Sequence, residues 1–226
     1  MARIINVCPG VFQVGGSRLS YPEDCCVYLV EGEGESALID TGAGKSADII
    51  IENMVRDGID IDKIKTIIVT HGHIDHIGGL KTIKDKLQAR VVCHELELPA
   101  VEEGLPHLTA AGWYGVKYNG VAVEQVLKGA EEKIKLGDLE LVCLHTPGHT
   151  PGGISVYVDI EDKRVLFGQD IHGPFNREWG SDLKLWRQSM EKLLALEADI
   201  LCEGHFGIYS PAAAVKQYIN SYLRRY

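Results

Sequence analysis

The chemistry of this 226-residue chain is concentrated in one short stretch, residues 70–79, with the sequence THGHIDHIGG. Within six positions it contains His71, His73, Asp75 and His76. A lone histidine is usually an ordinary surface or core residue, but four ligand-type side chains this close together predict a metal site. In extended chain His71 and His73 can point the same way, because alternate residues share a face. The other two follow as the chain turns, so one loop could serve two metal ions.

Three later loops each place a ligand-type side chain directly after a strand-like run. These are His149 in the segment HTPGHTPGG after residues 139–144, Asp170 after residues 164–166, and His205 after residues 200–202. Functional groups of α/β folds gather at the carboxyl ends of strands. Together with the first cluster, these loops supply five histidines and two aspartates. That count fits two four-coordinate metal sites that share one carboxylate.

A site of this composition predicts hydrolysis. Imidazole and carboxylate ligands suit zinc, with iron and manganese as alternatives, and no thiolate is required. Two ions about 3.5–4 Å apart can hold one water between them and lower its pKa from about 15.7 to about 7. The bridging hydroxide can attack the carbonyl of a thioester, ester or lactone, while Asp75 binds metal and orients the nucleophile. The chain has no GxSxG motif, so a serine nucleophile is not indicated.

The elements that must position these groups alternate along the first half of the chain. Apolar runs at residues 4–7, 11–14, 26–30 and 36–40 predict antiparallel strands joined by glycine-rich turns. The last of these runs ends in Asp40, which could equally be a functional carboxylate or the cap of the following turn. A predicted β-α-β-α-β order then comprises the helix 47–58, the strand 65–70, the helix 76–88 and the strand 90–93.

Residues 94–130 interrupt this alternation. Residues 95–103 predict a helix, but a proline and three glycines break the remainder. We expect an insertion near the site that acts as a lid or a dimer contact. The alternative is a packed surface excursion in which aromatic residues such as Trp113 and Tyr114 simply belong to the core.

The strand pattern returns in the second half. Runs at residues 133–136, 139–145, 154–159, 164–167 and 200–202 predict strands, and an apolar stripe over residues 183–197 predicts a helix. Ser210 and Pro211 predict the start of the last helix, with serine as N-cap and proline in the first turn. The two halves, roughly 1–120 and 121–226, suggest one domain over residues 1–226, built from two sheets packed face to face with helices outside.

Composition limits the partners. The formal net charge is −9, from 32 acidic and 23 basic residues, which argues against a nucleic-acid partner. The six cysteines form no CxxC pair, and Cys93, Cys143 and Cys202 lie in apolar runs and are expected to be buried thiols. The first residues show no signal peptide, and no apolar run is long enough to span a bilayer. We therefore expect a cytoplasmic protein with no membrane partner.

These motifs together resemble the metallo-β-lactamase fold superfamily, and within it the glyoxalase II-like hydrolases. The resemblance is carried by LIDTG at residues 38–42, HxHxDH at 71–76, TPGHT at 146–150, Asp170 and the pair Gly204-His205. It implies an α/β fold, a four-layer αβ/βα sandwich of two mixed sheets with the metals at one edge. It also implies that Asp40 supports a ligand histidine through its second ring nitrogen.

The resemblance further implies a ligand assignment for two divalent ions. One metal would be bound by His71, His73 and His149, the other by Asp75, His76 and His205, with Asp170 bridging the two. Two other residues are candidate substrate contacts. His172 either faces the substrate or is an exposed loop residue, and Arg177 either binds a carboxylate or acyl chain or takes part in ordinary loop packing. We expect a small-molecule substrate and a homodimer.

The motifs are specific for the fold but much less specific for the substrate. Only one helix follows the last ligand, whereas glyoxalase II carries a C-terminal helical domain that binds glutathione. Gly173 stands where related lactonases place a tyrosine, and His73 stands where flavodiiron relatives place a glutamate. We therefore expect a glyoxalase II-like hydrolase without the glutathione site. The alternative is a persulfide dioxygenase, an enzyme class that shares this fold and retains these motifs but uses one iron, which His71, His149 and Asp170 would hold. The motifs alone do not exclude it.

Overall fold

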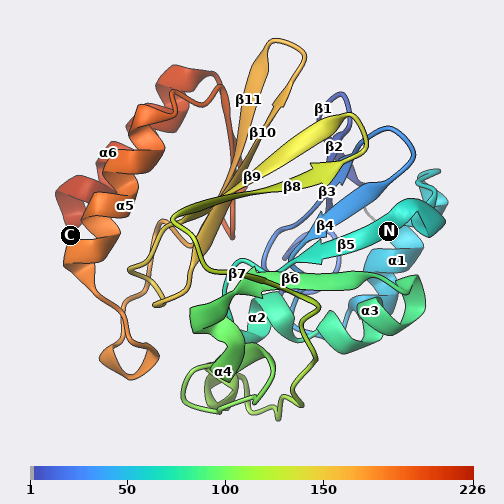
Figure 1. The fold of residues 1–226 in the computed structure, drawn as a ribbon, viewed down its shortest axis with the longest axis horizontal. Coiled ribbons are helices and arrows are strands. Elements are labelled where there is room, and N and C mark those ends of the chain that lie inside the picture. Colours follow the sequence, from blue (N-terminus) through green and yellow to red (C-terminus); the bar gives the residue numbers. More distant parts are fainter. Residues whose placement is uncertain (1–2) are drawn as a thin grey trace.

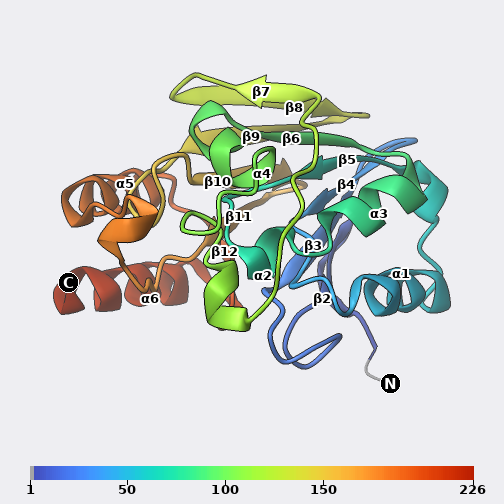
Figure 2. The same ribbon diagram turned by 90° about the horizontal axis from the view of Figure 1, so that it is seen from below.

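Two β-sheets pack face to face in the computed structural model, which describes residues 3–226, and helices cover their outer faces (Figures 1 and 2). This is the αβ/βα sandwich predicted from the sequence. The strand-forming runs are rich in β-branched residues, which fit a pleated and buried surface. The helices between them carry one apolar face each.

The first sheet has seven strands in sequence order: β1 (Ile5–Cys8), β2 (Val11–Gly15), β3 (Val27–Glu31), β4 (Ser36–Ile39), β5 (Ile64–Ile68), β6 (Arg90–His94) and β7 (Gln125–Leu127). The first four strands pair antiparallel, and β4 to β7 pair parallel. Parallel neighbours need crossover connections, and helices supply those on either side of β5. The sheet is therefore mixed.

The second sheet has six strands in the order β13-β12-β11-β10-β9-β8. Their bounds are β8 (Glu131–Leu136), β9 (Leu139–His145), β10 (Ile154–Ile160), β11 (Lys163–Gln169), β12 (Ile200–Glu203) and β13 (Ile208–Tyr209). Strand β10 pairs antiparallel with both β9 and β11, while β11 and β12 are parallel. The carboxyl ends of β9, β11 and β12 consequently lie at the same edge of the sheet, and each is followed by one of the predicted ligand loops.

Helices form the two outer layers. The α-helices are α1 (Ala47–Arg56), α2 (Ile74–Ile77), α3 (Leu80–Leu87), α4 (Leu98–Val101), α5 (Leu183–Ala195) and α6 (Ala212–Arg225). Short 3-10 turns are η1 (Ile61–Lys63), η2 (Glu95–Glu97), η3 (Ala111–Tyr114) and η4 (Arg177–Trp179). Helices α1 and α3 lie on the side of the first sheet, and α5 and α6 lie on the side of the second (Figure 1).

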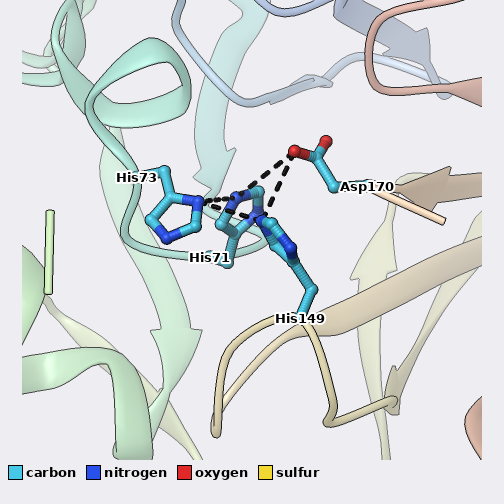
Figure 3. Close-up of side chains that lie close together, drawn as sticks. All are labelled: His71, His73, His149 and Asp170. Carbon is cyan, nitrogen blue, oxygen red and sulfur yellow. Dashed lines mark hydrogen bonds and ion pairs between the residues drawn. The ribbon is translucent and has the colours of Figure 1, made fainter. Parts of the chain in front are cut away.

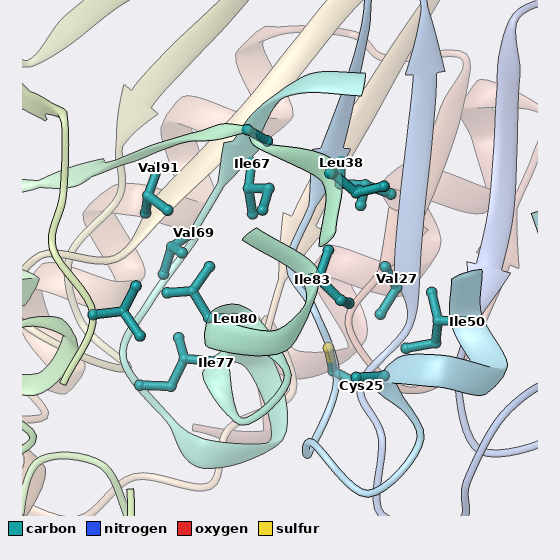
Figure 4. Close-up of a cluster of buried hydrophobic side chains, with 14 of the residues drawn as sticks. Cys25, Val27, Leu38, Ile50, Ile67, Val69, Ile77, Leu80, Ile83 and Val91 are labelled. Carbon is teal, nitrogen blue, oxygen red and sulfur yellow. The ribbon is translucent and has the colours of Figure 1, made fainter. Parts of the chain in front are cut away.

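Three buried clusters hold the layers together. Figure 4 shows the first cluster, in which Ile50 of α1 and Leu80 of α3 pack with sheet residues such as Leu38. The second cluster lies between the sheets, where the rings of Tyr28 and Phe167 are 5.5 Å apart. The third packs α5 and α6 on the second sheet. Burial on both faces fixes the position of the sheets and thus of the loops at their edge.

Several local predictions were wrong. The helix predicted over residues 76–88 is two helices, α2 and α3, separated by Gly78 and Gly79. A Cβ at Gly78 would lie 2.3 Å from the carbonyl oxygen of Ala43, so these glycines let the backbone approach the 41–44 loop. The predicted helix over 95–103 is only η2 and α4, and the segment 94–130 ends in an unpredicted edge strand, β7.

The start of the last helix also differs from the prediction. Pro211, not Ser210, occupies the N-cap position of α6, and no side chain caps the helix. Proline fits there because its own carbonyl accepts hydrogen bonds from Ala214 and Val215, while its extended backbone lies outside the first turn.

All six cysteines are buried free thiols, as predicted for Cys93, Cys143 and Cys202. None of the helices formed by residues 3–226 is long and apolar enough to cross a membrane.

Candidate metal centre

The predicted ligands converge where the two sheets meet at one edge. His71 and His73 follow β5, and the first turn of α2 continues the same loop. A hydrogen bond from the Ile154 backbone N–H to the Thr70 carbonyl joins this loop to the second sheet. His149 lies in the loop after β9. Figure 3 shows that the imidazoles of His71 and His73, which follow the first sheet, point toward the imidazole of His149, which follows a strand of the second.

The first group contains three imidazoles and one carboxylate: His71, His73, His149 and Asp170 (Figure 3). The Nδ1 atom of His73 lies 3.1 Å from His71 Nε2 and 2.9 Å from His149 Nε2. The Oδ2 atom of Asp170 lies 3.5 Å from His149 Nε2 and 3.9 Å from His71 Nε2. Ligands of a tetrahedral zinc ion, with bonds of about 2.0–2.1 Å, lie about 3.3 Å apart. The four atoms therefore fit one ion.

The second group contains Asp75, His76 and His205, with the other oxygen of Asp170. The Nε2 atom of His205 is 3.2 Å from Asp75 Oδ2 and 3.4 Å from Asp170 Oδ1. The Nε2 atom of His76 is 3.3 Å from Asp170 Oδ1 and 3.7 Å from Asp75 Oδ2. Thus Asp170 turns Oδ2 toward the first group and Oδ1 toward the second.

Buried atoms that make no hydrogen bond support a ligand at this second position. Within residues 3–226, neither His76 Nε2 nor Asp170 Oδ1 has a hydrogen-bond partner, although both atoms are buried. A buried polar atom without a partner costs about 1–3 kcal/mol. A cation between these atoms would remove that cost, so the residues fit a second metal ion.

Asp40 orients His76. Its Oδ2 accepts a hydrogen bond from His76 Nδ1 at 2.8 Å, which leaves His76 Nε2 facing the ligand group. The carboxylate is itself held by the Thr70 N–H at 2.9 Å and the Thr70 hydroxyl at 2.7 Å. Asp40 adopts φ +61°, a left-handed conformation at the end of β4. Asp40 thus pairs with the second ring nitrogen of His76, and its supporting role in metal binding stays a prediction. The Nδ1 atom of His149 is similarly paired with the Pro174 carbonyl oxygen at 2.8 Å.

The electrostatics keep the ligands of the first group in metal-binding form. Burial and neighbouring imidazoles hold the pKa values of His71 and His73 well below their usual range, and burial also lowers the pKa of His149. Burial opposes ionisation of Asp170, but His205 and His76 outweigh it and hold its pKa well below normal. The imidazoles are therefore neutral and the carboxylate is charged, the forms that bind metal.

In the protein without metal, the second ligand group differs from the first because it contains a protonated histidine. Burial alone would lower the pKa of His205, but the carboxylates of Asp170 and Asp75 raise it to about 10. Cys25 also lies within ligand distance of Asp40 and His76. Burial raises the pKa of the Cys25 thiol, so it stays protonated and is a poor ligand. The carboxylates Asp75 and Asp170 thus favour a cation at this position.

Two buried glutamates hold the ligand loops, and sequence analysis missed both. Glu97 accepts hydrogen bonds from the Gly72 N–H at 2.7 Å and the Gly152 N–H at 2.8 Å, and so joins the loops of both sheets. Glu203 accepts the His205 N–H at 2.7 Å and pairs with His172 Nδ1 at 2.8 Å. Glu203 ends strand β12 and Glu97 lies three residues after the end of β6, and this closeness to strand ends was the available signal.

A cavity of about 400 Å³ opens onto these ligands. His172 lines it, beside His205. Arg177 is exposed and is not among the lining residues. Trp179, from the same η4 turn, faces the ligands instead, with its ring 4.5 Å from that of His73. The substrate contacts proposed for His172 and Arg177 stay predictions.

The segment 94–130 also reaches the cavity, because Trp113 and Tyr114 line it. Burial, together with the nearby carboxylate of Asp75, raises the pKa of Tyr114. Its phenol is therefore a neutral hydrogen-bond donor beside the second ligand group. The sequence indicated aromatic residues near the site but not this contact.

Known proteins resemble this chain in sequence and in fold. The chain is 28% identical to a probable metallo-hydrolase, YflN of Bacillus subtilis, over 212 residues that cover 79% of each protein. It is 27% identical to the acyl-coenzyme A thioesterase MBLAC2 of Bos taurus, over 64% of this chain and 57% of that protein. Among solved structures, the class B3 di-zinc metallo-beta-lactamase LRA-12 from an Alaskan soil metagenome superposes with a TM-score of 0.83 at 21% identity, covering 99% of this chain and 91% of that one.

A family model supplies the remaining comparison. The model of the metallo-beta-lactamase superfamily matches residues 21–205 and so includes every predicted ligand. The chain therefore belongs to the metallo-beta-lactamase superfamily.

Proposed function

We propose that the protein is a dinuclear metal-dependent hydrolase that cleaves a thioester, ester or lactone, as glyoxalase II-like enzymes do. The division of Asp170 between two ligand groups carries this proposal, because one carboxylate then serves two cations. The names of two relatives, a probable metallo-hydrolase and a thioesterase, agree with it. Zinc suits the imidazole and carboxylate ligands best, with iron or manganese as alternatives.

Two divalent ions, when bound, would supply a water of lowered pKa as nucleophile and would polarise the substrate carbonyl. The chain's own residues determine the rest. The ligand histidines and Asp170 fix the positions of the charges, and Asp75, which lines the cavity, can accept a hydrogen bond from the attacking water. The Tyr114 hydroxyl lies on the same side and can donate a hydrogen bond to the substrate.

The complete second ligand group favours the dinuclear hydrolase over the dioxygenase. A single iron would need only His71, His149 and Asp170, and no ion would then occupy the position between Asp75, His76 and His205. The buried atoms His76 Nε2 and Asp170 Oδ1 would then remain without hydrogen-bond partners in the described chain. We therefore infer that both positions are used.

Metal analysis and a substrate panel test this proposal. We expect about two metal ions per chain by mass spectrometry, and hydrolysis of thioesters or lactones but not of phosphodiesters. His71→Ala should lose metal and hydrolysis together. His107→Ala, which replaces an exposed histidine outside the site, is the matched control. A single iron per chain, with oxygen consumed on glutathione persulfide, would refute the proposal and support the dioxygenase.

A further inference from the structure

Two tryptophans form one wall of the cavity above the first ligand group. The ring of Trp179 lies 4.5 Å from that of His73 and 5.9 Å from that of His149, and its side chain is only 4% exposed. The ring of Trp113 lies 4.8 Å from Trp179 on the outer side and is 67% exposed. We call this pair the tryptophan wall. It extends from the ligand histidines to the solvent.

The tryptophan wall lies outside the three clusters that hold the sheets and helices together. Trp113 and Trp179 come from separate turns, η3 and η4, and neither belongs to the three buried clusters. Both line the cavity. An exposed tryptophan that reaches a cavity offers a large apolar surface to a ligand, since its burial is still incomplete.

Away from the ligand groups, the wall of the cavity carries little charge. Among the described residues that line it there is no lysine or arginine. Asp24 is the only acidic residue of that lining outside the ligand set. Both its oxygens are already engaged, with the Ala43 N–H and with the hydroxyls of Ser20 and Ser46. Arg18 lines a second hollow, which shares Ser17, His205 and Phe206 with this cavity. A carboxylate at the outer end of the tryptophan wall, beside Trp113, would therefore lose water without gaining a lysine or arginine partner.

We propose that the tryptophan wall is an acyl-binding site, which takes the uncharged aromatic acyl group of a thioester or ester such as phenylacetyl. This inference rests on the proposed hydrolase function. A phenyl ring can pack against the exposed ring of Trp113, beside the buried Trp179, while the scissile carbonyl extends toward the ligand groups. Aromatic pairs with centroids about 4.5–7 Å apart are the preferred arrangement of such rings.

Thioesters with one neutral leaving group test the proposal. We would compare phenylacetyl, acetyl and succinyl thioesters of N-acetylcysteamine with the metal-loaded enzyme. The kcat/KM for phenylacetyl should exceed that for succinyl by at least about fivefold. Trp113→Ala should reduce the ratio of kcat/KM for phenylacetyl to that for acetyl by about fivefold, mainly through KM, and Trp113→Phe should restore it. Val55→Ala, an exposed apolar residue of α1 outside the cavity, is the control.

A binding measurement separates failure of this inference from failure of the hydrolase proposal. Phenylacetone, a ketone without a scissile bond, should quench tryptophan fluorescence, and Trp113→Ala should weaken that binding about fivefold. Levulinate, its carboxylate-bearing counterpart, should bind less tightly. If phenylacetone binds in this way while no thioester is cleaved, the acyl site stands and the hydrolase proposal fails.

Two results would overturn the acyl site. One is hydrolysis in which the acyl ratios of Trp113→Ala equal those of the parent. The other is a change in oligomeric state, by light scattering, that accounts for the whole effect of Trp113→Ala, since Trp113 would then be a contact between chains.

Discussion

Glu97 offers a sharp test of how the ligand loops are positioned. Its side chain is 3% exposed, and its two oxygens accept N–H groups from Gly72 and Gly152. Gly72 separates His71 from His73, and Gly152 closes the loop that carries the third histidine of the first group. Glu97→Gln preserves the shape of the side chain but turns an NH₂ group toward one of these two N–H donors.

The structure gives the size of the effect. One buried N–H loses its acceptor, which costs about 1–3 kcal/mol, so we expect the free energy of unfolding of the metal-free protein to fall by about 2 kcal/mol. For a domain of this size that corresponds to a decrease of about 4–8 °C in Tm. Loss of a residue that orients metal ligands typically weakens metal binding about 10–100-fold, and we expect about tenfold here.

Two assays check these values. Urea unfolding of the metal-free protein gives the free energy, and competition with a chelator gives the Kd for metal. The control is Glu95→Gln, because Glu95 lies on the same short segment but is exposed. If Glu97→Gln matched the parent in both assays, Glu97 would not hold the two loops and the reasoning would be refuted.

Three further predictions concern single positions. Asp170→Asn should reduce bound metal below about one ion per chain and hydrolysis by at least about a hundredfold, as counted by native mass spectrometry and a thioester assay; two retained ions would contradict the shared carboxylate. In metal-free protein the raised pKa of His205 means that its charged form stabilises the fold below pH 6.5, and this contribution is lost as the pH rises through about 10. The stability difference between the parent and His205→Ala should therefore shrink over that range in urea unfolding, whereas a constant difference would argue against the charge. A Cβ at Gly148 would lie 2.3 Å from Trp186 Cα at φ +141°, so Gly148→Ala should cost about 3 kcal/mol by thermal unfolding, and an unchanged Tm would exclude this strain.

Local sequence was sufficient to predict those elements in which the apolar residues of the sequence pattern are also the buried residues of the structure. Strands such as β5 and β10 are apolar or alternate with period two, and the structure places them in the sheets. The helix break at Gly78 and Gly79 was not predicted, because it depends on contact with a loop more than thirty residues earlier. Strand β7 was not predicted because three residues are too few to show a periodic pattern. Its residues form a strand because they pair with β6.

The sequence by itself determined the chemistry of the site: imidazoles and carboxylates, at the ends of strands, in numbers that fit two ions. Only the tertiary structure decided how they divide, with the oxygens of Asp170 turned toward different ligand groups. It alone joined Glu97 to the loops of both sheets and placed Tyr114 and the tryptophan wall over the ligands. These contacts join segments far apart in the chain, and spacing along a sequence carries no information about such distances until the two sheets have packed.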